Sequence, residues 1–436
     1  MKILLLSDQV NFNIPHQNIR GTENILKIIF NELELKGINV EVLKANENRE
    51  INMNEKDNLI NYFSRGKLND TSYFKDKLRE IKPDLVQFNG FSNTWGFSHL
   101  VACKELNVKT VLWHNIPTIT CMQHELLYMS KVPCDGKFSL KKCTACRLNL
   151  STKSEFISNI FGTFGNFPIK FFNYKFLDRV LSARKYSYEF YNSIKLIANY
   201  FDVVLYGAEW VKNVLLINNF NKDKIVFIRP SLSNEFWSLY SDKKSNFLDQ
   251  KNTCNRKNIN FLFWGRLVSA KGMNVIRKAI RKLKNHQYTI HIVGDMNNGD
   301  QSFNRLFSEN KNNEKIVFHN ALDQTSIFKL GIKCDLALIP SSWFETGPIT
   351  VYEAFAMRLP VIGTRLGGVE ELCTHNYNSL LFDLNNHNEL ANFMISLIKK
   401  PEKIDYLRSN IPKPRSPKDL AKEINLVYER LMGNNT

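Results

Sequence analysis

The stretch 340–372, PSSWFETGPITVYEAFAMRLPVIGTRLGGVEEL, holds two carboxylates, Glu345 and Glu353, separated by seven residues. Gly347 and Pro348 lie between them and predict a helix start, because proline suits a first helical position where its missing N–H would be unpaired anyway. The first-turn N–H groups of such a helix favour an anion, commonly a phosphate. The stretch therefore predicts an anion-binding helix start flanked by two carboxylates, which suits a phosphate linked to hydroxyl-bearing sugars.

Strands and helices alternate on both sides of this stretch. The apolar segment Lys2–Ser7 predicts a strand, a helix is expected over Glu23–Lys36, and Ile38–Leu43 predicts the next strand. This β-α-β order indicates a parallel sheet. The alternation restarts with a predicted strand at Ile259–Trp264. We therefore expect an α/β fold with two Rossmann-like, doubly wound parallel-sheet domains facing a central cleft.

The length of 436 residues exceeds what one ordinary core accommodates. We expect an N-terminal domain over residues 1–236, with an insertion over 116–200. A C-terminal domain is expected over 237–408, and its polar first part, 237–257, suits a linker. Residues 409–436 should contain a helix that packs back on the N-terminal domain.

Composition and charge limit where the protein acts. The apolar run Ile3–Leu6 is too short for a signal peptide, and no apolar stretch approaches the roughly 18 residues of a membrane span. We therefore expect a cytoplasmic protein. The formal net charge is +17, and residues 131–185 carry 11 Lys and Arg against 3 Asp and Glu, a net of +8. Such a surface attracts nucleic acid, anionic lipid or acidic substrates, although a coding bias of the genome explains a Lys-rich composition equally well.

A second anion-binding candidate follows the strand predicted at Ile259–Trp264. Arg266 and Lys271 flank a short loop there, in the sequence GRLVSAKG. Two fixed cations could neutralise a diphosphate, since Arg grips two oxygens at once and Lys acts as a point charge. Taken alone, the loop is better explained by two solvated surface charges. The anion-binding helix start in the same domain favours the functional interpretation.

Three motifs together resemble those of retaining glycosyltransferases of family 4, which have the GT-B fold. They are Gly-Arg-x(4)-Lys-Gly from Gly265, Glu-x(7)-Glu from Glu345, and Pro-Val-Ile-Gly-Thr-x-x-Gly-Gly-x-x-Glu from Pro360. The resemblance is close over residues 265–371 and loose elsewhere. It implies that a UDP- or GDP-sugar binds the C-terminal domain, and that the two cations replace a catalytic metal.

The resemblance also implies a role for each matching residue. Arg266 and Lys271 would hold the diphosphate, Glu353 would bind the ribose, and Glu345 would bind hydroxyls of the transferred sugar. Backbone N–H groups would complete the donor site at Gly347, Ile349 and Thr350. In the N-terminal domain, Gly21 matches the second of a pair of family glycines that contact the sugar or acceptor, and Arg20 replaces the first. His114 matches a histidine that lines the reaction centre, whereas a lone strand-end histidine would more often be structural.

The implied activity is that of a retaining hexosyltransferase. The sugar would pass to a glycan or lipid-linked acceptor, as in surface polysaccharide or glycolipid synthesis, with electrostatic stabilisation of the departing diphosphate. Fold alone also allows another GT-B enzyme, such as a nucleotide-sugar epimerase. The basic charge allows a non-catalytic polyanion-binding protein. We favour the transferase and expect no nucleic-acid partner.

The predicted insertion carries a cysteine cluster, at Cys121, Cys134, Cys143 and Cys146. Four thiolates ending in Cys-x-x-Cys could form a structural zinc site. The same ligands suit an iron–sulfur cluster, and unconnected reduced thiols are the third alternative. Some members of the resembled family carry a similar Cys-rich insertion after the histidine.

An aromatic and basic stretch follows the cysteines. Residues 156–176 contain seven phenylalanines interleaved with Lys170 and Lys175. A core helix could explain some of these residues. The composition equally suits peripheral contact with an anionic membrane surface at the inner face of the membrane, which would fit a lipid-linked acceptor.

Overall fold

The computed structural model describes residues 1–7, 21–44, 71–91, 95–115, 117–164, 175–243 and 258–433. The chain forms two compact units, each built on a six-stranded sheet. The first unit comprises Met1–Asn11, Ile29–Arg229 and Ala421–Thr436, and the second comprises Phe12–Ile28 and Pro230–Leu420. Among the described helices, none combines the length and the apolar composition needed to cross a bilayer.

The sheet of the first unit is parallel throughout, in the order β2-β1-β3-β4-β7-β8. Residues 3–6 of the central strand β1 are buried, as expected for a parallel strand covered on both faces. The strands span Lys2–Ser7 (β1), Asn39–Lys44 (β2), Leu85–Phe88 (β3), Lys109–His114 (β4), Val203–Tyr206 (β7) and Ile225–Phe227 (β8). Its helices include α3 (Ser72–Ile81), α4 (Phe97–Glu105) and α8 (Glu209–Ile217), while α1 (Gly21–Glu34) begins in the second unit and ends in the first.

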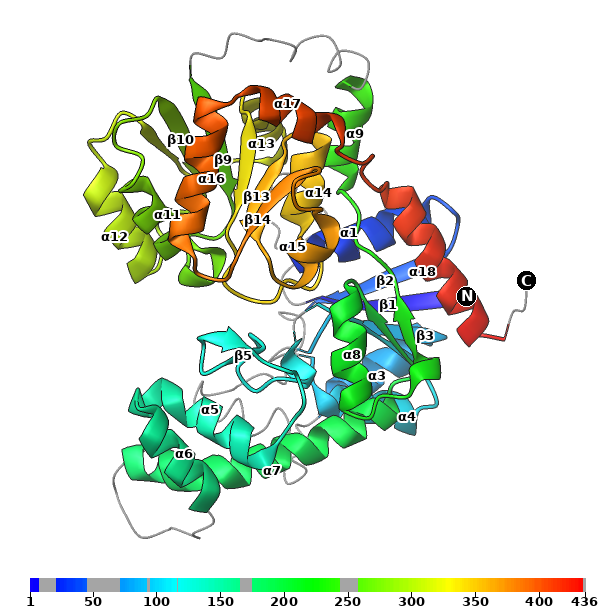
Figure 1. The fold of residues 1–436 in the computed structure, drawn as a ribbon. Helices are drawn as coiled ribbons and strands as arrows, with labels where there is room; N and C mark the ends of the chain where they lie inside the picture. The colour runs from blue at the N-terminus through cyan, green and yellow to red at the C-terminus, as the bar shows by residue number, and fades with distance from the viewer. Residues whose placement is uncertain are drawn as a thin grey trace. The chain divides into compact units, whose positions relative to one another are not determined.

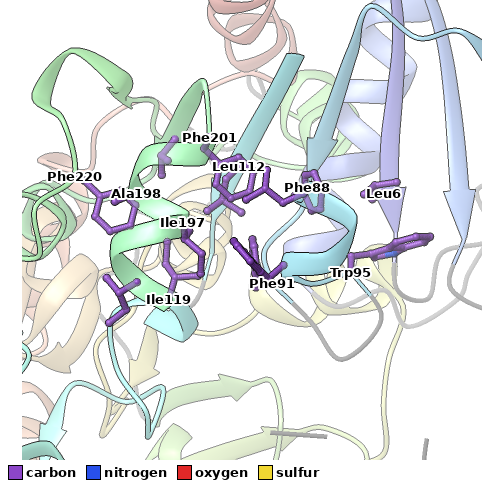
Figure 2. Packing of buried hydrophobic residues seen from close by; sticks show 14 of the residues in the cluster. Leu6, Phe88, Phe91, Trp95, Leu112, Ile119, Ile197, Ala198, Phe201 and Phe220 are labelled. Atoms are coloured by element: carbon purple, nitrogen blue, oxygen red, sulfur yellow. The ribbon is translucent and has the colours of Figure 1, made fainter. Parts of the chain in front are cut away.

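Aromatic rings join this sheet to Phe201, the residue directly after the helix that ends at Tyr200. Figure 2 shows Phe88 of β3 and Phe91 next to Phe201, and their ring centroids lie 5.4 and 5.7 Å from that of Phe201. The C-terminal helix α18 (Pro417–Leu431) contacts the same sheet, since the Tyr428 hydroxyl donates to Gln87 Oε1 in β3. Ser416 caps α18, because its Oγ accepts from the backbone N–H of Asp419 at 3.1 Å.

The insertion between β4 and β7 is mainly helical. It contains η2 (Pro117–Ile119), β5 (Leu127–Tyr128), β6 (Val132–Pro133), α5 (Leu140–Thr152), α6 (Glu155–Phe164) and α7 (Lys175–Tyr200). Figure 1 shows α5 and α6 packed together at the end of α7 that is remote from the six-stranded sheet of this unit.

The sheet of the second unit is also parallel, in the order β11-β10-β9-β12-β13-β14. Its strands span Ile259–Trp264 (β9), Tyr288–Val293 (β10), Ile316–His319 (β11), Leu336–Ile339 (β12), Val361–Thr364 (β13) and Ser379–Phe382 (β14). Its helices are α9 (Asn234–Lys243), α11 (Met273–Ile280), α12 (Gln301–Asn310), α13 (Gln324–Gly331), α14 (Ile349–Ala356), α15 (Gly367–Leu372), α16 (His387–Lys399) and α17 (Glu402–Ser409), with the short η4 (Ser269–Lys271). The predicted fold of two parallel-sheet, Rossmann-like domains is confirmed.

Two local predictions were wrong. Residues 237–243 were expected in a linker, but they form the larger part of α9. Phe236 and Tyr240 of this helix are buried in a core cluster of the second unit. The rest of that predicted linker, 244–257, lies outside the described residues. Pro348 is the N-cap of α14 and not its first helical residue, with an extended ψ of 101°.

Candidate active site

The order of strands in the second unit brings two loops together. The chain proceeds from β9 to β10 and β11 on one side, then returns to β12 on the other side of β9. The carboxyl ends of β9 and β12 therefore flank a topological switch point, where ligands bind in open α/β sheets. The loop after β9 carries Arg266 and Lys271, and the loop after β12 carries Glu345. The two loops touch, because the backbone N–H of Ser342 donates to the carbonyl oxygen of Ala270 at 2.8 Å.

Gly272 makes this close approach possible. Its φ is 85°, in the left-handed region, and an added Cβ would overlap the carbonyl oxygen of Pro340. We expect Gly272→Ala to lower the free energy of unfolding by about 1–3 kcal/mol more than Gly37→Ala. Gly37 is the matched control because its φ is 74° and an added Cβ would have no neighbour within 4 Å. Urea unfolding of both variants measures the difference, and equal losses would show that the contact with Pro340 is not restrictive.

Lys271 and Glu345 form the central ion pair of the site. Lys271 Nζ lies 2.5 Å from Glu345 Oε1, and the Ser341 hydroxyl donates to the same oxygen at 2.8 Å. Burial alone would raise the pKa of Glu345, but the charge of Lys271 and the hydrogen bonds more than offset it and hold that pKa below its usual value. Glu345 is therefore a carboxylate at neutral pH, with a cation fixed beside it.

Trp343 lies close to both predicted cations. Its ring centroid is 5.2 Å from Arg266 Cζ and 5.4 Å from Lys271 Nζ, within the range of cation–π attraction. One aromatic side chain therefore contacts both cations, although they are five residues apart. Trp343 was not predicted from the sequence, where its only signal is an aromatic residue two positions before Glu345.

Glu353 occupies a different environment on α14. Its Oε2 accepts a hydrogen bond from Trp264 Nε1, at the end of β9, at 2.6 Å. Burial raises the pKa of Glu353 to about 7, although the Trp264 bond acts in the opposite direction. This carboxyl therefore titrates near neutral pH, whereas Glu345 stays ionised. Trp264 was also missed from the sequence, because 89 residues separate it from Glu353.

The start of α14 lies beside these side chains. Ile349 and Thr350 are its first two residues, so their backbone N–H groups belong to the unpaired first turn. Gly347 lies in the preceding loop, which is held by a bond from the Gly368 N–H to the carbonyl oxygen of Glu345 at 2.8 Å. The structure thus brings together seven predicted residues in the second unit: Arg266, Lys271, Glu345, Gly347, Ile349, Thr350 and Glu353.

Two further predicted site residues, His114 and Gly21, come from the N-terminal part of the chain. His114 is the last residue of β4 in the first unit, and it is buried. Burial lowers its pKa to about 4, so the imidazole is neutral, and its Nε2 has no hydrogen-bond partner among the described residues. Gly21 is the first residue of α1, and Arg20 lies outside the described residues.

The predicted metal site is not supported. Within the described ranges, which include all four clustered cysteines, no group of three or more His, Cys, Asp or Glu side chains is placed to hold a metal ion. The sulfurs have other partners: Cys146 Sγ accepts from Met129 N at 3.1 Å, and Cys143 Sγ accepts from Ser139 N at 3.4 Å. Burial raises the pKa of Cys143 to about 12 and that of Cys146 to about 11, and the neighbouring Cys121 and Cys134 act in the same direction.

Part of this chain is similar in sequence to known proteins. Residues 244–414 match the family described as Glycosyl transferases group 1. An uncharacterised glycosyltransferase of Methanocaldococcus jannaschii is 27% identical over 218 residues, which cover 48% of this chain and 60% of that relative. The matched part of the chain thus spans less than two thirds of that relative's length.

Solved structures resemble the whole chain. Sucrose-phosphate synthase from Thermosynechococcus elongatus superposes with a TM-score of 0.62 at 13% identity, covering 100% of both chains. Anabaena HepE in complex with UDP-glucose superposes with a TM-score of 0.58 at 15% identity, covering 99% of both chains. Residues 244–414 of the second unit thus match the family described as Glycosyl transferases group 1, and the chain has the GT-B fold.

Proposed function

We propose that the protein is a retaining hexosyltransferase of the family 4 type that moves a sugar from a nucleotide-diphosphate sugar to a glycan or lipid-linked acceptor. The observation that carries the proposal is the Lys271–Glu345 ion pair at the switch point of the second unit. Arg266 and Lys271 both lie within cation–π distance of the Trp343 ring. A fixed cation next to an ionised carboxylate suits a ligand that has a diphosphate at one end and hydroxyl groups at the other.

The donor would bind as follows. Arg266, Lys271 and the first-turn N–H groups of α14 would hold the diphosphate, since a helix start favours a bound anion. Glu353 would accept hydrogen bonds from the ribose, and Glu345 would accept them from the transferred sugar. Anabaena HepE was crystallised with UDP-glucose, which makes a UDP-sugar the first donor to test.

The reaction would be a front-face transfer with retention at the anomeric carbon. The bond between that carbon and the β-phosphate oxygen breaks, the acceptor oxygen bonds to the same face, and the acceptor proton passes to the departing diphosphate. Arg266 and Lys271 would stabilise the charge that develops on the diphosphate, so the step needs no catalytic metal. Neutral His114 and Gly21 are proposed to act on the acceptor side.

The pathway and the location are part of the same proposal. A lipid-linked or glycan acceptor suits surface polysaccharide or glycolipid synthesis at the inner face of a membrane. The cytoplasmic location expected from the sequence fits a nucleotide-sugar donor.

A donor screen tests the proposal. We expect one UDP-, GDP- or ADP-sugar to raise the melting temperature of the protein and to release nucleoside diphosphate when an acceptor extract is added. Nuclear magnetic resonance of the product should show the anomeric configuration of the donor. Inverted product would exclude retention, and interconversion of the donor sugar without transfer would favour an epimerase. Failure of every donor to bind would refute the proposed function.

A further inference from the structure

Helix α6 of the insertion presents bulky apolar side chains to solvent. Phe156 is 75% exposed, Ile157 is 42% exposed and Ile160 is 41% exposed. The small residues Ser158 and Gly162 are buried on the inner side, and a Cβ added to Gly162 would lie 3.0 Å from the Ala145 Cβ of α5. Among the described side chains of α6, the small residues therefore face the protein, while Phe156, Ile157 and Ile160 are exposed to solvent.

Contacts from neighbouring elements fix the position of α6. Arg184 of α7 donates to the carbonyl oxygens of Gly162 and Thr163, at the C-terminal end of α6. At the other end, Glu155 lies 3.7 Å from Lys131 of the β5–β6 hairpin. The apolar face is therefore held in place by both α7 and the hairpin and does not depend on a ligand to form.

The hairpin extends the same surface. The ion pair to Glu155 brings Lys131 to the start of α6, and the next residue, Val132, is 53% exposed. Lys153, directly before α6, is also exposed. We call Lys131, Val132, Lys153, Phe156, Ile157 and Ile160 the α6 surface. It combines four apolar side chains with two lysines, and the acidic Glu155 lies beside it in contact with Lys131.

The charge around the α6 surface favours one kind of partner. Residues 131–185 carry a net charge of +8, and the whole chain carries +17. A lipid bilayer with anionic headgroups takes up apolar side chains and attracts lysines at the same time, and peripheral binding generally needs both contributions. We propose that the α6 surface docks the protein reversibly onto an anionic lipid bilayer. This proposal does not depend on the proposed transferase activity.

Vesicle sedimentation tests the proposal with the full-length protein. Wild-type protein should pellet with phosphatidylcholine vesicles that contain phosphatidylglycerol, and much less with phosphatidylcholine alone. The double variant Phe156→Ser, Ile160→Ser should lower the partition coefficient about tenfold or more, because it removes two apolar anchors. Lys131→Ala with Lys153→Ala should weaken binding to the anionic vesicles only, by about tenfold at low salt.

Leu35→Ser is the matched control. Leu35 is an isolated apolar side chain that is 80% exposed just after α1, so its loss should leave vesicle binding unchanged. All altered side chains are exposed, and melting curves should confirm that each variant folds. The proposal is overturned if wild-type protein stays in the supernatant, or if the Phe156, Ile160 double variant binds like wild type. It is also overturned if light scattering shows a wild-type dimer that this double variant dissociates, because a second copy of the chain would then cover the α6 surface.

Discussion

Replacing Lys271 by alanine should reduce sugar transfer by about a hundredfold to a thousandfold, because the variant loses a cation aimed at the departing diphosphate. The loss should appear in kcat as well as in the KM of the donor, since the charge on the diphosphate increases as the sugar leaves. Steady-state kinetics with the donor identified in the screen measures both constants. Lys271→Arg should recover only part of the rate, because the planar guanidinium cannot occupy the position of Nζ.

The effect should be specific to this lysine. Lys315 is the matched control: its Nζ lies 5.4 Å from the Tyr288 ring centroid, and it precedes β11 at the amino end of the sheet, away from the switch point. Lys315→Ala should leave the transfer rate unchanged.

Glu345→Ala should also abolish transfer, and combining it with Lys271→Ala should add little, because both act through one ion pair. Removing only Lys271 leaves a buried carboxyl without its cation, so the pKa of Glu345 should rise in that variant. Melting curves show whether the unpaired carboxyl lowers the stability of the variant, which separates a loss of stability from a loss of function. Full activity of both folded single variants would refute the assignment of the site.

The sequence could predict the loops of the donor site but not the side chains that organise them. Arg266 and Lys271 lie in one short motif, and Glu345 and Glu353 lie in another, so their spacing was visible in the chain. Trp343 was not found, since its contact with two cations requires the loops after β9 and β12 to be neighbours. That neighbourhood follows from the strand order, which the alternation of helices and strands does not determine.

The spacing of the cysteine cluster predicted a metal site that the described part of the structure does not support. Cys143 and Cys146 have a spacing typical of metal ligands, but spacing does not determine where each sulfur points. In the fold, the N–H groups of Ser139 and Met129 donate to these two sulfurs. Helix α5 and the loop before it therefore use the thiols in local packing.

Glu353 should make donor binding depend on pH around neutrality. Its pKa is about 7, so the fraction of ionised carboxylate rises with pH through this value. An ionised carboxylate accepts stronger hydrogen bonds from ribose hydroxyls than a protonated one. The affinity for the donor should therefore increase severalfold between pH 6 and pH 8, while Glu353→Gln should bind weakly at both. Calorimetric titration with the nucleoside diphosphate measures this dependence.

Trp264→Phe provides a sharper version of this test. The Trp264 N–H stabilises the ionised form of Glu353, so its removal should raise the pKa of Glu353 and move the binding profile to higher pH. An unchanged profile in this variant would show that another group titrates.

Stability should change with pH in the opposite direction to donor binding. The pKa of Glu353 is higher in the folded protein than its ordinary value of 4.5, so the folded state holds the proton more tightly than the unfolded chain. The contribution of this carboxyl is therefore most favourable below pH 4.5 and is lost as the pH rises through about 7. Glu353→Gln, which stays neutral and can still accept from Trp264, should be more stable than wild type at pH 8 by up to about 3 kcal/mol and nearly equal at pH 5. Urea unfolding at the two pH values measures this difference. A variant that is less stable than wild type at pH 8 would contradict this prediction. It would mean that ionisation of Glu353 does not lower the stability of the folded protein. The carboxyl would then not be retained in the binding site at the expense of stability.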